Sequence, residues 1–276
     1  MISCLCVTRT DRLAFLVTAV GDFARQVLTN RELVIVHDGD AAAEAAILAV
    51  ASVHPGACVR VVQVVPGPLL GGLRNAAVQA ARGDWVCQWD DDDRYHPLRL
   101  SLQWDAAQAE GAAACYLVDQ LHWFRAEGGA ESGAEGLLCW DDWDREAYPL
   151  NVVQGTLLAR RAVMPAYPNV ARGEDTLHTH ALMRASVQLG FEVARLRGAG
   201  WCYVYCHHGA NVWDAAHHQA ISTAKHLPAA RLLPRLAVLR VRLRDYEPEL
   251  PTMFIQVGAK LETLVSAPDR TLTEAP

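Results

Sequence analysis

The chain alternates short apolar runs with longer stretches in which apolar residues recur every three or four positions. Four of the short runs are rich in apolar and β-branched residues and are typical of buried strands; they cover residues 2–7, 32–38, 58–65 and 84–90. After the first run, one face of a predicted helix carries Leu13, Leu16, Val20, Phe23 and Val27. Strands that alternate with amphipathic helices predict a mostly parallel sheet with helices on both faces.

The second half of the chain mixes strand and helix patterns. It predicts strands at 112–126, 191–197 and 201–209, and helices at 98–109, after Asp175 and at 214–227. Asp175 is expected to be the N-cap of its helix. From residue 228 the chain is rich in leucine and arginine, and we expect this segment to pack on the main domain or on a partner, with a homodimer as one option. The expected organisation is one domain over 1–227, with halves 1–97 and 98–227, followed by an extension over 228–276.

Composition and charge narrow the class of protein. The chain has 276 residues, a formal net charge of -6 and a pI near 6.0, which argues against a nucleic-acid binder or an anionic-membrane binder. We find neither a signal-peptide pattern nor an apolar run long enough to cross a bilayer. The cysteines form no paired zinc-binding array and are expected to be buried thiols in strands, as for Cys4, Cys6, Cys58, Cys87 and Cys115. The sequence therefore predicts a soluble, cytoplasmic protein.

Acidic and polar residues follow three of the four apolar runs. Four aspartates, residues 90–93, come directly after the fourth run, residues 8–11 follow the first, and Asp38 ends the second. Ligands of parallel sheets bind at the carboxyl ends of the strands. Carboxylates crowded into a small volume repel one another unless a cation joins them, and Mg²⁺ or Mn²⁺ with substrate phosphates meets that need. The alternative is a solvated acidic turn.

The same segments resemble the family 2 glycosyltransferases of the GT-A fold, over about the first 215 residues. Five matches occur in order: VTRTDR (7–12), ELVIVHDGD (32–40), GGLRNAAVQAARGDW (71–85), WDDDDRYHP (89–97) and RGEDT (172–176). The fourth stands in the place of the DxD motif and the fifth in the place of the motif that bears the catalytic base. The resemblance implies an α/β fold with a Rossmann-like, mostly parallel sheet flanked by helices. It also implies a small antiparallel sheet on the acceptor side, with residues 1–97 as the nucleotide-binding half.

For the nucleotide, the resemblance implies that Thr8 and Asp38 contact the nucleoside, with Arg9 and Asp11 in the same loop as Thr8. His37 departs from the family pattern, because many relatives have an acidic residue at this position. Arg9 departs too, because a small polar residue is common there. Both departures leave the identity of the base open.

For the diphosphate and the metal, the resemblance implies that Arg74 lies near the diphosphate or sugar. Asp90 and Asp92 would hold the sugar and the metal, with Asp92 as the direct metal ligand. Asp91 is counted with the nucleotide-binding residues, yet Asp91 and Asp93 are also candidates for bystanders, because adjacent strand side chains face opposite ways. The alternative for Arg74 is a simple ion pair with a surface carboxylate.

Asp175 is the predicted general base of an inverting transfer, and Glu174 is expected to orient an acceptor hydroxyl or the adjacent loop. The structural alternatives are that Asp175 only caps its helix and that Asn75 only holds a turn. His208 stands where many GT-A enzymes carry a histidine that ligates the metal, and His207 is the alternative.

Other histidines and a second acidic cluster remain to be placed. We expect His178 and His180 to be partly exposed, and His217 and His218 to cover the nucleotide or to face solvent. In CWDDWD (139–144) we expect an acceptor-side loop in which Trp140 or Trp143 presents a flat face to a sugar ring and Asp141 or Asp142 binds hydroxyls; ordinary packing of the tryptophans is the alternative. Gly155 is expected to allow a close backbone approach to a substrate.

The sequence thus predicts a metal-dependent, inverting glycosyltransferase of polysaccharide biosynthesis. It would use a nucleotide diphosphate donor, with UDP-sugar favoured, and a saccharide or other hydroxyl acceptor. One alternative is a non-catalytic nucleotide-sugar-binding protein. The other is a sugar-phosphate nucleotidyltransferase, which would need a glycine-rich loop behind the first strand, where this chain has no glycine.

Overall fold

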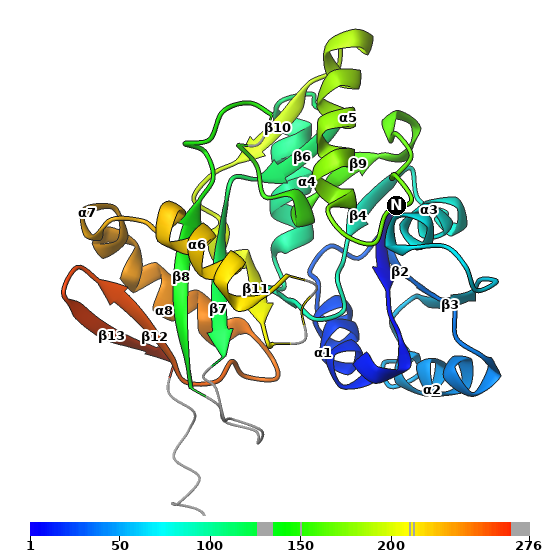
Figure 1. The fold of residues 1–276 in the computed structure, drawn as a ribbon, viewed down its shortest axis with the longest axis horizontal. Helices are drawn as coiled ribbons and strands as arrows, with labels where there is room; N and C mark the ends of the chain where they lie inside the picture. Colours follow the sequence, from blue (N-terminus) through cyan, green and yellow to red (C-terminus); the bar gives the residue numbers. More distant parts are fainter. Residues whose placement is uncertain (126–134, 150, 210, 212, 266–276) are drawn as a thin grey trace, which may run out of the picture.

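The computed structural model describes residues 1–125, 135–149, 151–209, 211 and 213–265, and it contains two sheets that lie side by side (Figure 1). The first sheet has the order β10-β6-β9-β4-β1-β2-β3. Its strands are β1 (Ile2–Val7), β2 (Arg31–His37), β3 (Val59–Gln63), β4 (Trp85–Gln88), β6 (Ala114–Leu117), β9 (Leu158–Arg160) and β10 (Val193–Leu196). Only β9 runs antiparallel to its neighbours in this sheet. The predicted mostly parallel sheet is confirmed.

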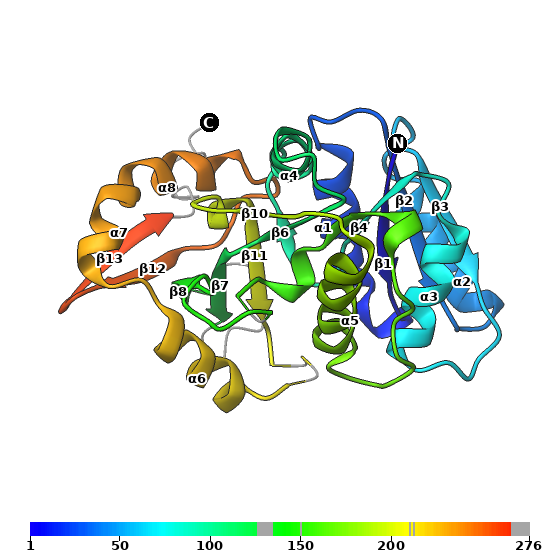
Figure 2. The same cartoon turned by 90° about the horizontal axis from the view of Figure 1, so that it is seen from above.

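Helices cover both faces of the first sheet (Figure 2). Strand alternation turns Cys4 and Cys6 of β1 toward α1 and α4, whereas Leu5 packs with α3. The helices are α1 (Leu13–Ala24), α2 (Ala41–Ala51), α3 (Leu70–Ala80), α4 (Arg99–Ala109) and α5 (Glu174–Leu189). Both faces of the central strands are therefore buried, which explains why these strands read as continuous apolar runs.

Two local predictions in this half are wrong. The helix α1 ends at Ala24, and Val27 is 58% exposed beyond it. Arg31 causes this end, because its guanidinium donates to the carbonyl oxygens of Phe23, Ala24 and Leu28. Cys58 is exposed rather than buried, since it precedes the outermost strand of the sheet.

The second sheet is mixed rather than purely antiparallel. Its order is β13-β12-β8-β7-β11-β5, for β5 (Arg94–Tyr95), β7 (Asp119–Arg125), β8 (Gly136–Asp142), β11 (Tyr203–His207), β12 (Met253–Val257) and β13 (Lys260–Val265). The strands β7 and β11 are parallel because they follow β6 and β10, which are parallel neighbours in the first sheet. The predicted strand pair at 112–126 is thus two strands in different sheets.

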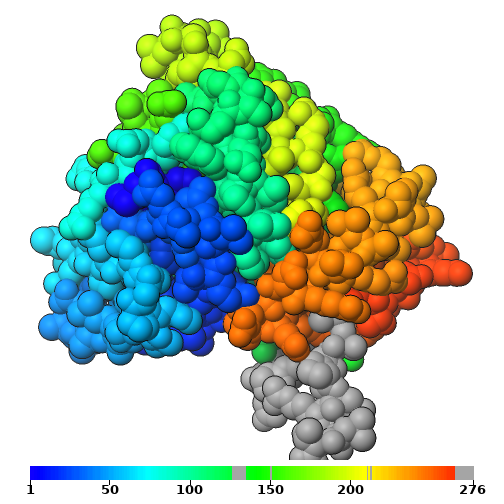
Figure 3. Space-filling model, turned by 180° about the vertical axis from the view of Figure 1, so that it is seen from behind, coloured from blue at the N-terminus to red at the C-terminus, as the bar shows by residue number. Residues whose placement is uncertain are grey.

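The C-terminal segment packs on the rest of the chain, which is one of the two expected outcomes. β12 pairs in parallel with β8, and α7 (Ala229–Leu232) and α8 (Leu236–Arg242) bury leucines against the second sheet. The same segment lies beside the helix α1 (Figure 3). Arg25, which follows that helix, donates to the carbonyl oxygen of Asp245. The helix α6 (Ala215–Lys225) covers the opposite face of this sheet from α8 (Figure 2). Within the described ranges, no helix has the length and apolar character needed to cross a bilayer.

Candidate active site

The carboxyl ends of β1 and β4 meet where the strand order of the first sheet reverses direction. β2 and β3 lie on one side of β1, and β4 lies on the other. Such a switch point leaves an open crevice in which parallel sheets bind ligands. Here it holds a cavity of about 140 Å³, which we call the acidic pocket; Arg12, Arg74, residues 90–93, Glu174 and Asp175 are among its lining residues.

Two of the four aspartates point into the protein and fasten the acidic loop. Asp91 accepts a hydrogen bond from the Thr8 hydroxyl at 2.7 Å. Asp93 accepts from the Tyr203 hydroxyl and from the Cys206 backbone N–H, which joins the loop to β11. Burial, followed by repulsion from neighbouring carboxylates, raises the pKa of Asp91 to about 7 and the pKa of Asp93 well above its ordinary value. Both side chains are almost fully buried, so their first role is to hold the loop.

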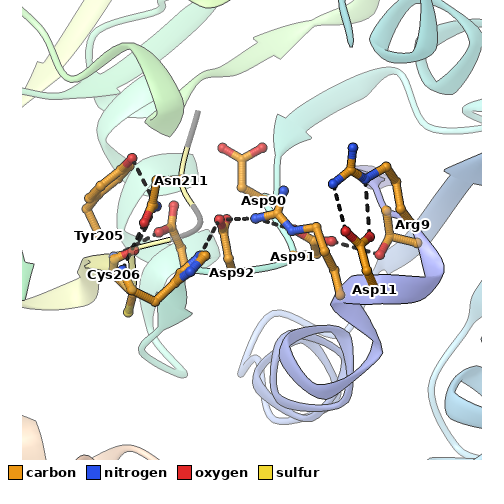
Figure 4. A network of polar contacts seen from close by, with 12 residues as sticks. Arg9, Asp11, Asp90, Asp91, Asp92, Tyr205, Cys206 and Asn211 are labelled. Atoms are coloured by element: carbon orange, nitrogen blue, oxygen red, sulfur yellow. Dashed lines mark hydrogen bonds and ion pairs between the residues drawn. The ribbon is translucent and has the colours of Figure 1, made fainter. Parts of the chain in front are cut away.

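Asp92 lies between two basic side chains from distant parts of the chain (Figure 4). Arg12 forms an ion pair with it, and His208 Nε2 lies 3.1 Å from its Oδ2. Burial alone would raise the pKa of Asp92, but the hydrogen bond from His208 and the charge of Arg12 lower it. His207 faces away from the aspartates and packs instead beside Phe124. Of the two candidate histidines, His208 is therefore the one that reaches the acidic loop.

Arg74 links the acidic loop to the RGEDT segment. Its guanidinium lies 2.9 Å from Asp90 Oδ1 and 2.9 Å from Glu174 Oε1, and both Arg74 and Glu174 are buried. An ion pair with a surface carboxylate is therefore excluded as the role of Arg74. Asn75 exchanges two hydrogen bonds with the backbone of Tyr167. It therefore holds the loop that contains Tyr167, in line with the structural role given above as the alternative for Asn75.

Gly71 and Gly72 allow the loop that contains Pro168 and Asn169 to pack on the helix α3. Gly71 and Gly72 lie in the first turn of α3 rather than in a turn before it. A Cβ on Gly71 would lie 1.8 Å from the carbonyl oxygen of Pro168, and one on Gly72 would lie 2.7 Å from Asn169 Oδ1. At Gly71 only glycine permits the close approach of the Pro168 backbone, whereas Gly72 makes room for a side chain.

Asp175 lies in the first turn of α5 and lines the acidic pocket. The prediction that it caps this helix is wrong, because the N-cap is Gly173, whose φ of 72° favours glycine. Burial, followed by the negative charge of Glu174, raises the pKa of Asp175. A carboxylate held at a rigid helix end with a raised pKa is well placed to accept a proton.

A second cavity of about 240 Å³ begins at Asp90 and Asp175 and extends toward the second sheet. We call it the aromatic pocket, because its walls include Trp143, Tyr203, Tyr205 and Trp213, and also Gln120, Gln154 and Gly155. A Cβ on Gly155 would lie 3.2 Å from the Tyr203 hydroxyl and 3.7 Å from Asp90 Oδ2. The tightest neighbour of Gly155 is therefore the Tyr203 hydroxyl, and a close approach to a substrate stays a prediction.

The CWDDWD segment is mostly strand, which overturns part of its prediction. β8 extends to Asp142, and Trp140 and Asp141 are buried within it. Trp140 donates from Nε1 to Asp119 Oδ2 at 2.7 Å, so it cannot offer a face to a sugar. Trp143 follows the strand and lines the aromatic pocket, where a sugar ring could pack on it.

The other histidines also differ in part from expectation. His178 is buried, not exposed, and stacks on Tyr167 with ring centroids 3.9 Å apart. His218 is buried beside Tyr205 in the wall of the aromatic pocket. His217 is exposed and stacks on Trp213. Both helix α6 histidines lie next to the aromatic pocket and face away from the acidic loop.

The donor atoms around Asp92 fit a divalent cation. Carboxylate oxygens with one imidazole suit Mg²⁺ or Mn²⁺, and the crowded aspartates are balanced here by the guanidinium groups of Arg12 and Arg74. Asp92 and His208 are the residues that would hold the ion.

A second group fits less well. Ligand atoms of Cys139, Asp141 and His226 lie within 4.8 Å of one another. However, His226 Nδ1 accepts from the Trp140 N–H, and its Nε2 donates to the Gln256 carbonyl oxygen, so neither ring nitrogen can bind a metal.

Comparisons with known proteins bear on the family and on the fold. Residues 5–125 match the family described as "Glycosyl transferase family 2". Over 97 residues the chain is 35% identical to the succinoglycan biosynthesis protein ExoO of Rhizobium meliloti (strain 1021), a match that covers 35% of this chain and 27% of that protein. The chain therefore spans about a quarter of this curated relative.

Two solved structures share the whole architecture. S. aureus TarS 1–349 in complex with UDP gives a TM-score of 0.54 at 15% identity, covering 89% of this chain and 66% of that one. The mannosyltransferase PcManGT from Pyrobaculum calidifontis, in complex with GDP-Man and Mn²⁺, gives 0.56 at 13% identity, covering 88% of this chain and 69% of that one. The fold is thus the GT-A fold of glycosyltransferases. The likeness to the family 2 glycosyltransferases extends over residues 5–125, which is less than half of the chain.

Proposed function

We propose that the chain transfers a sugar from a nucleotide diphosphate donor to a hydroxyl acceptor, with inversion at the sugar and with a divalent metal. The observation that carries this proposal is the position of Asp90 and Asp175. Both lie where the acidic pocket, suited to metal and diphosphate, opens into the aromatic pocket, suited to a sugar. A donor and an acceptor bound in the two pockets would meet at these carboxylates.

The donor side rests on the ends of β1, β2 and β4. Thr8 and Asp38 follow β1 and β2, and are proposed to contact the nucleoside. Arg9 and Asp11 form an exposed ion pair with each other above the same edge, so their proposed nucleotide contacts require that pair to open. A UDP-sugar is the favoured donor, supported by the UDP complex of TarS; the GDP-Man complex of PcManGT makes GDP-sugar the second choice.

Mn²⁺ or Mg²⁺ held by Asp92 and His208 would stabilise the charge on the departing diphosphate. Asp175 removes the proton of the attacking acceptor hydroxyl, and the bond from the donor sugar to the diphosphate breaks as the new glycosidic bond forms. Attack from the face opposite the leaving group inverts the anomeric centre. Arg74 fixes Asp90 and Glu174 in place, which keeps the acidic loop and the first turn of α5 at a constant separation.

A transfer assay tests the proposal. UDP-Glc, UDP-Gal, UDP-GlcNAc and GDP-Man are supplied with Mn²⁺, Mg²⁺ or EDTA, and the release of UDP or GDP is measured with and without saccharide acceptors. We expect metal-dependent release that Asp92→Asn abolishes. Metal-dependent nucleotide binding without any release would instead identify a non-catalytic nucleotide-sugar-binding protein. Formation of a nucleotide sugar from a sugar phosphate and an NTP would identify a nucleotidyltransferase.

A further inference from the structure

His122 lies in β7, in the wall of the aromatic pocket, and only 1% of it is exposed. Its Nδ1 lies 3.2 Å from Asp141 Oδ2 and 3.0 Å from the Ser222 hydroxyl. Its Nε2 is buried and has no hydrogen-bond partner among the described residues. A buried imidazole nitrogen without a partner is costly unless a ligand satisfies it.

The neighbours of His122 determine which ring nitrogen carries the proton. The Ser222 hydroxyl donates its only proton to Asp141 Oδ2 at 2.7 Å. Nδ1 therefore faces a carboxylate oxygen and a hydroxyl oxygen that both act as acceptors, so it carries the proton. Nε2 then holds a lone pair and can only accept a hydrogen bond. This arrangement also differs from a hydrolytic Ser-His-Asp triad, in which histidine accepts the proton of the serine.

The lining of the aromatic pocket indicates the chemistry of its occupant. None of the residues that line it is arginine or lysine, in contrast to the acidic pocket. Its walls include Trp143 and Trp213, whose rings are contacted by Lys225 and Arg172, and the side chains of Gln120 and Gln154. Aromatic rings beside neutral polar groups suit a polyhydroxylated ring, and a lining without arginine or lysine does not suit a phosphate.

We propose that His122, oriented by Asp141, accepts a hydrogen bond from a hydroxyl of a saccharide acceptor, a hydroxyl other than the one that Asp175 deprotonates. This inference rests on the proposed transferase function, because it assigns the acceptor to the aromatic pocket. His122 thereby determines which acceptor sugar binds in the aromatic pocket and how that sugar is oriented. Asp141 is a positioning residue, since it acts only by fixing the tautomer of His122.

Direct binding provides the first test. Methyl glycosides of glucose, galactose, mannose and N-acetylglucosamine are titrated by NMR into the protein with UDP, or GDP if that nucleotide binds, and Mn²⁺. We expect at least one glycoside to bind wild type. Its affinity for His122→Phe should be 10–100-fold lower, because phenylalanine keeps a flat ring and lacks the acceptor nitrogen. The nucleotide affinity of the variant should change less than threefold. If no glycoside binds wild type, or if the variant binds equally well, the proposal is wrong.

A deoxy series identifies the hydroxyl. Monodeoxy versions of the best glycoside are compared on wild type and His122→Phe. One analogue should bind wild type 10–100-fold more weakly than its parent glycoside does. On the variant the same analogue should bind as well as the parent, because the contact is already absent. Additive losses for every analogue would show that His122 contacts no hydroxyl.

Kinetic measurements distinguish the proposed roles of His122 and Asp141 from a general effect of the substitutions on folding. Asp141→Asn should raise KM for the glycoside with little change in kcat. Failure of the transferase proposal would appear differently, as no donor turnover by wild type although the glycoside still binds. His54→Phe, a half-exposed histidine outside both pockets, is the matched control and should behave as wild type.

Discussion

His208 Nε2 lies 3.1 Å from Asp92 Oδ2, although 116 residues separate the two in the chain. Phe15 stacks on the His208 ring at 4.3 Å, and Asn211 accepts from the His208 backbone N–H. The His208 ring is thus held between the helix α1 and the acidic loop, and its backbone is fixed by Asn211. Asp92 and His208 come from different halves of the chain. A metal held by both would therefore couple metal binding to the correct packing of the two halves.

Loss of either proposed metal ligand should weaken donor binding. Asp92→Asn and His208→Ala are each expected to reduce the affinity for UDP with Mn²⁺ by at least about 10–100-fold, because loss of even an outer-shell partner weakens a metal site by that order. Calorimetric titration of UDP, with Mn²⁺ and then with EDTA, measures the effect. Asp105→Asn, an exposed aspartate on α4, is the matched control. Equal affinities in Mn²⁺ and EDTA for wild type would contradict the metal proposal.

Removal of the proposed base should affect chemistry and leave donor binding intact. Asp175→Asn is expected to lower kcat by roughly 10²–10⁴-fold, the usual contribution of a positioned general base. Because the pKa of Asp175 is raised and the carboxylate is the active form, kcat of wild type should fall as pH drops through a value above the ordinary range of aspartate. Activity and UDP affinity are measured in parallel. A variant that retains wild-type kcat would assign the base elsewhere.

The buried guanidinium of Arg74 should matter greatly for stability. Arg74→Met leaves Asp90 and the buried Glu174 without their shared cation, and breaking such a pair costs about 3–5 kcal/mol. Urea unfolding measures this loss. Arg197→Met removes an exposed pair with Asp144 and should cost less than about 1 kcal/mol. Similar losses for both variants would show that Arg74 is not an essential bridge.

His178 should make the protein less stable in mild acid. Burial lowers the pKa of His178 from 6.5 to about 4. Between these values the unfolded chain binds a proton that the folded protein does not, so stability falls as pH drops from 6.5 toward 4. At about 1.4 kcal/mol per pH unit, the full effect is on the order of 3 kcal/mol.

Urea unfolding at several pH values, with His178→Gln as the variant, isolates this effect from that of the carboxylates. The variant is expected to be less stable than wild type at pH 7, because it loses the stacking on Tyr167. The difference should narrow as pH falls to 4. His54→Gln should run parallel to wild type, and a constant difference for His178→Gln would contradict the assigned cause.

The elements of the first sheet could be predicted from the sequence because their signal is local. The apolar runs at β1, β2 and β4 are buried on both faces, and the polar residues at their ends mark the crevice. The spacing of these runs, with helices between them, leaves few alternatives to a parallel sheet. The order of strands then brings Thr8 and Asp91 together.

The second half was harder to predict, because its strands divide between two sheets and each strand buries its two faces differently. In β8, alternation sends Trp140 toward Asp119 and Asp141 toward His122. Periodicity identifies two faces of a strand, yet it does not say which face meets a helix and which lines a pocket. Trp143 faces the aromatic pocket because the strand ends just before it.

The sequence by itself determined the fold class, the acidic loop after β4 and the carboxylates of the RGEDT segment, since each depends on neighbouring residues. Only the tertiary structure decided that His208 and not His207 reaches Asp92 and that Arg74 is buried between Asp90 and Glu174. It also decided that His122 Nε2 has no hydrogen-bond partner in the part of the chain that the structure describes. Each of these contacts joins residues that are far apart in the chain, and their separation is set by the packing of whole sheets and helices.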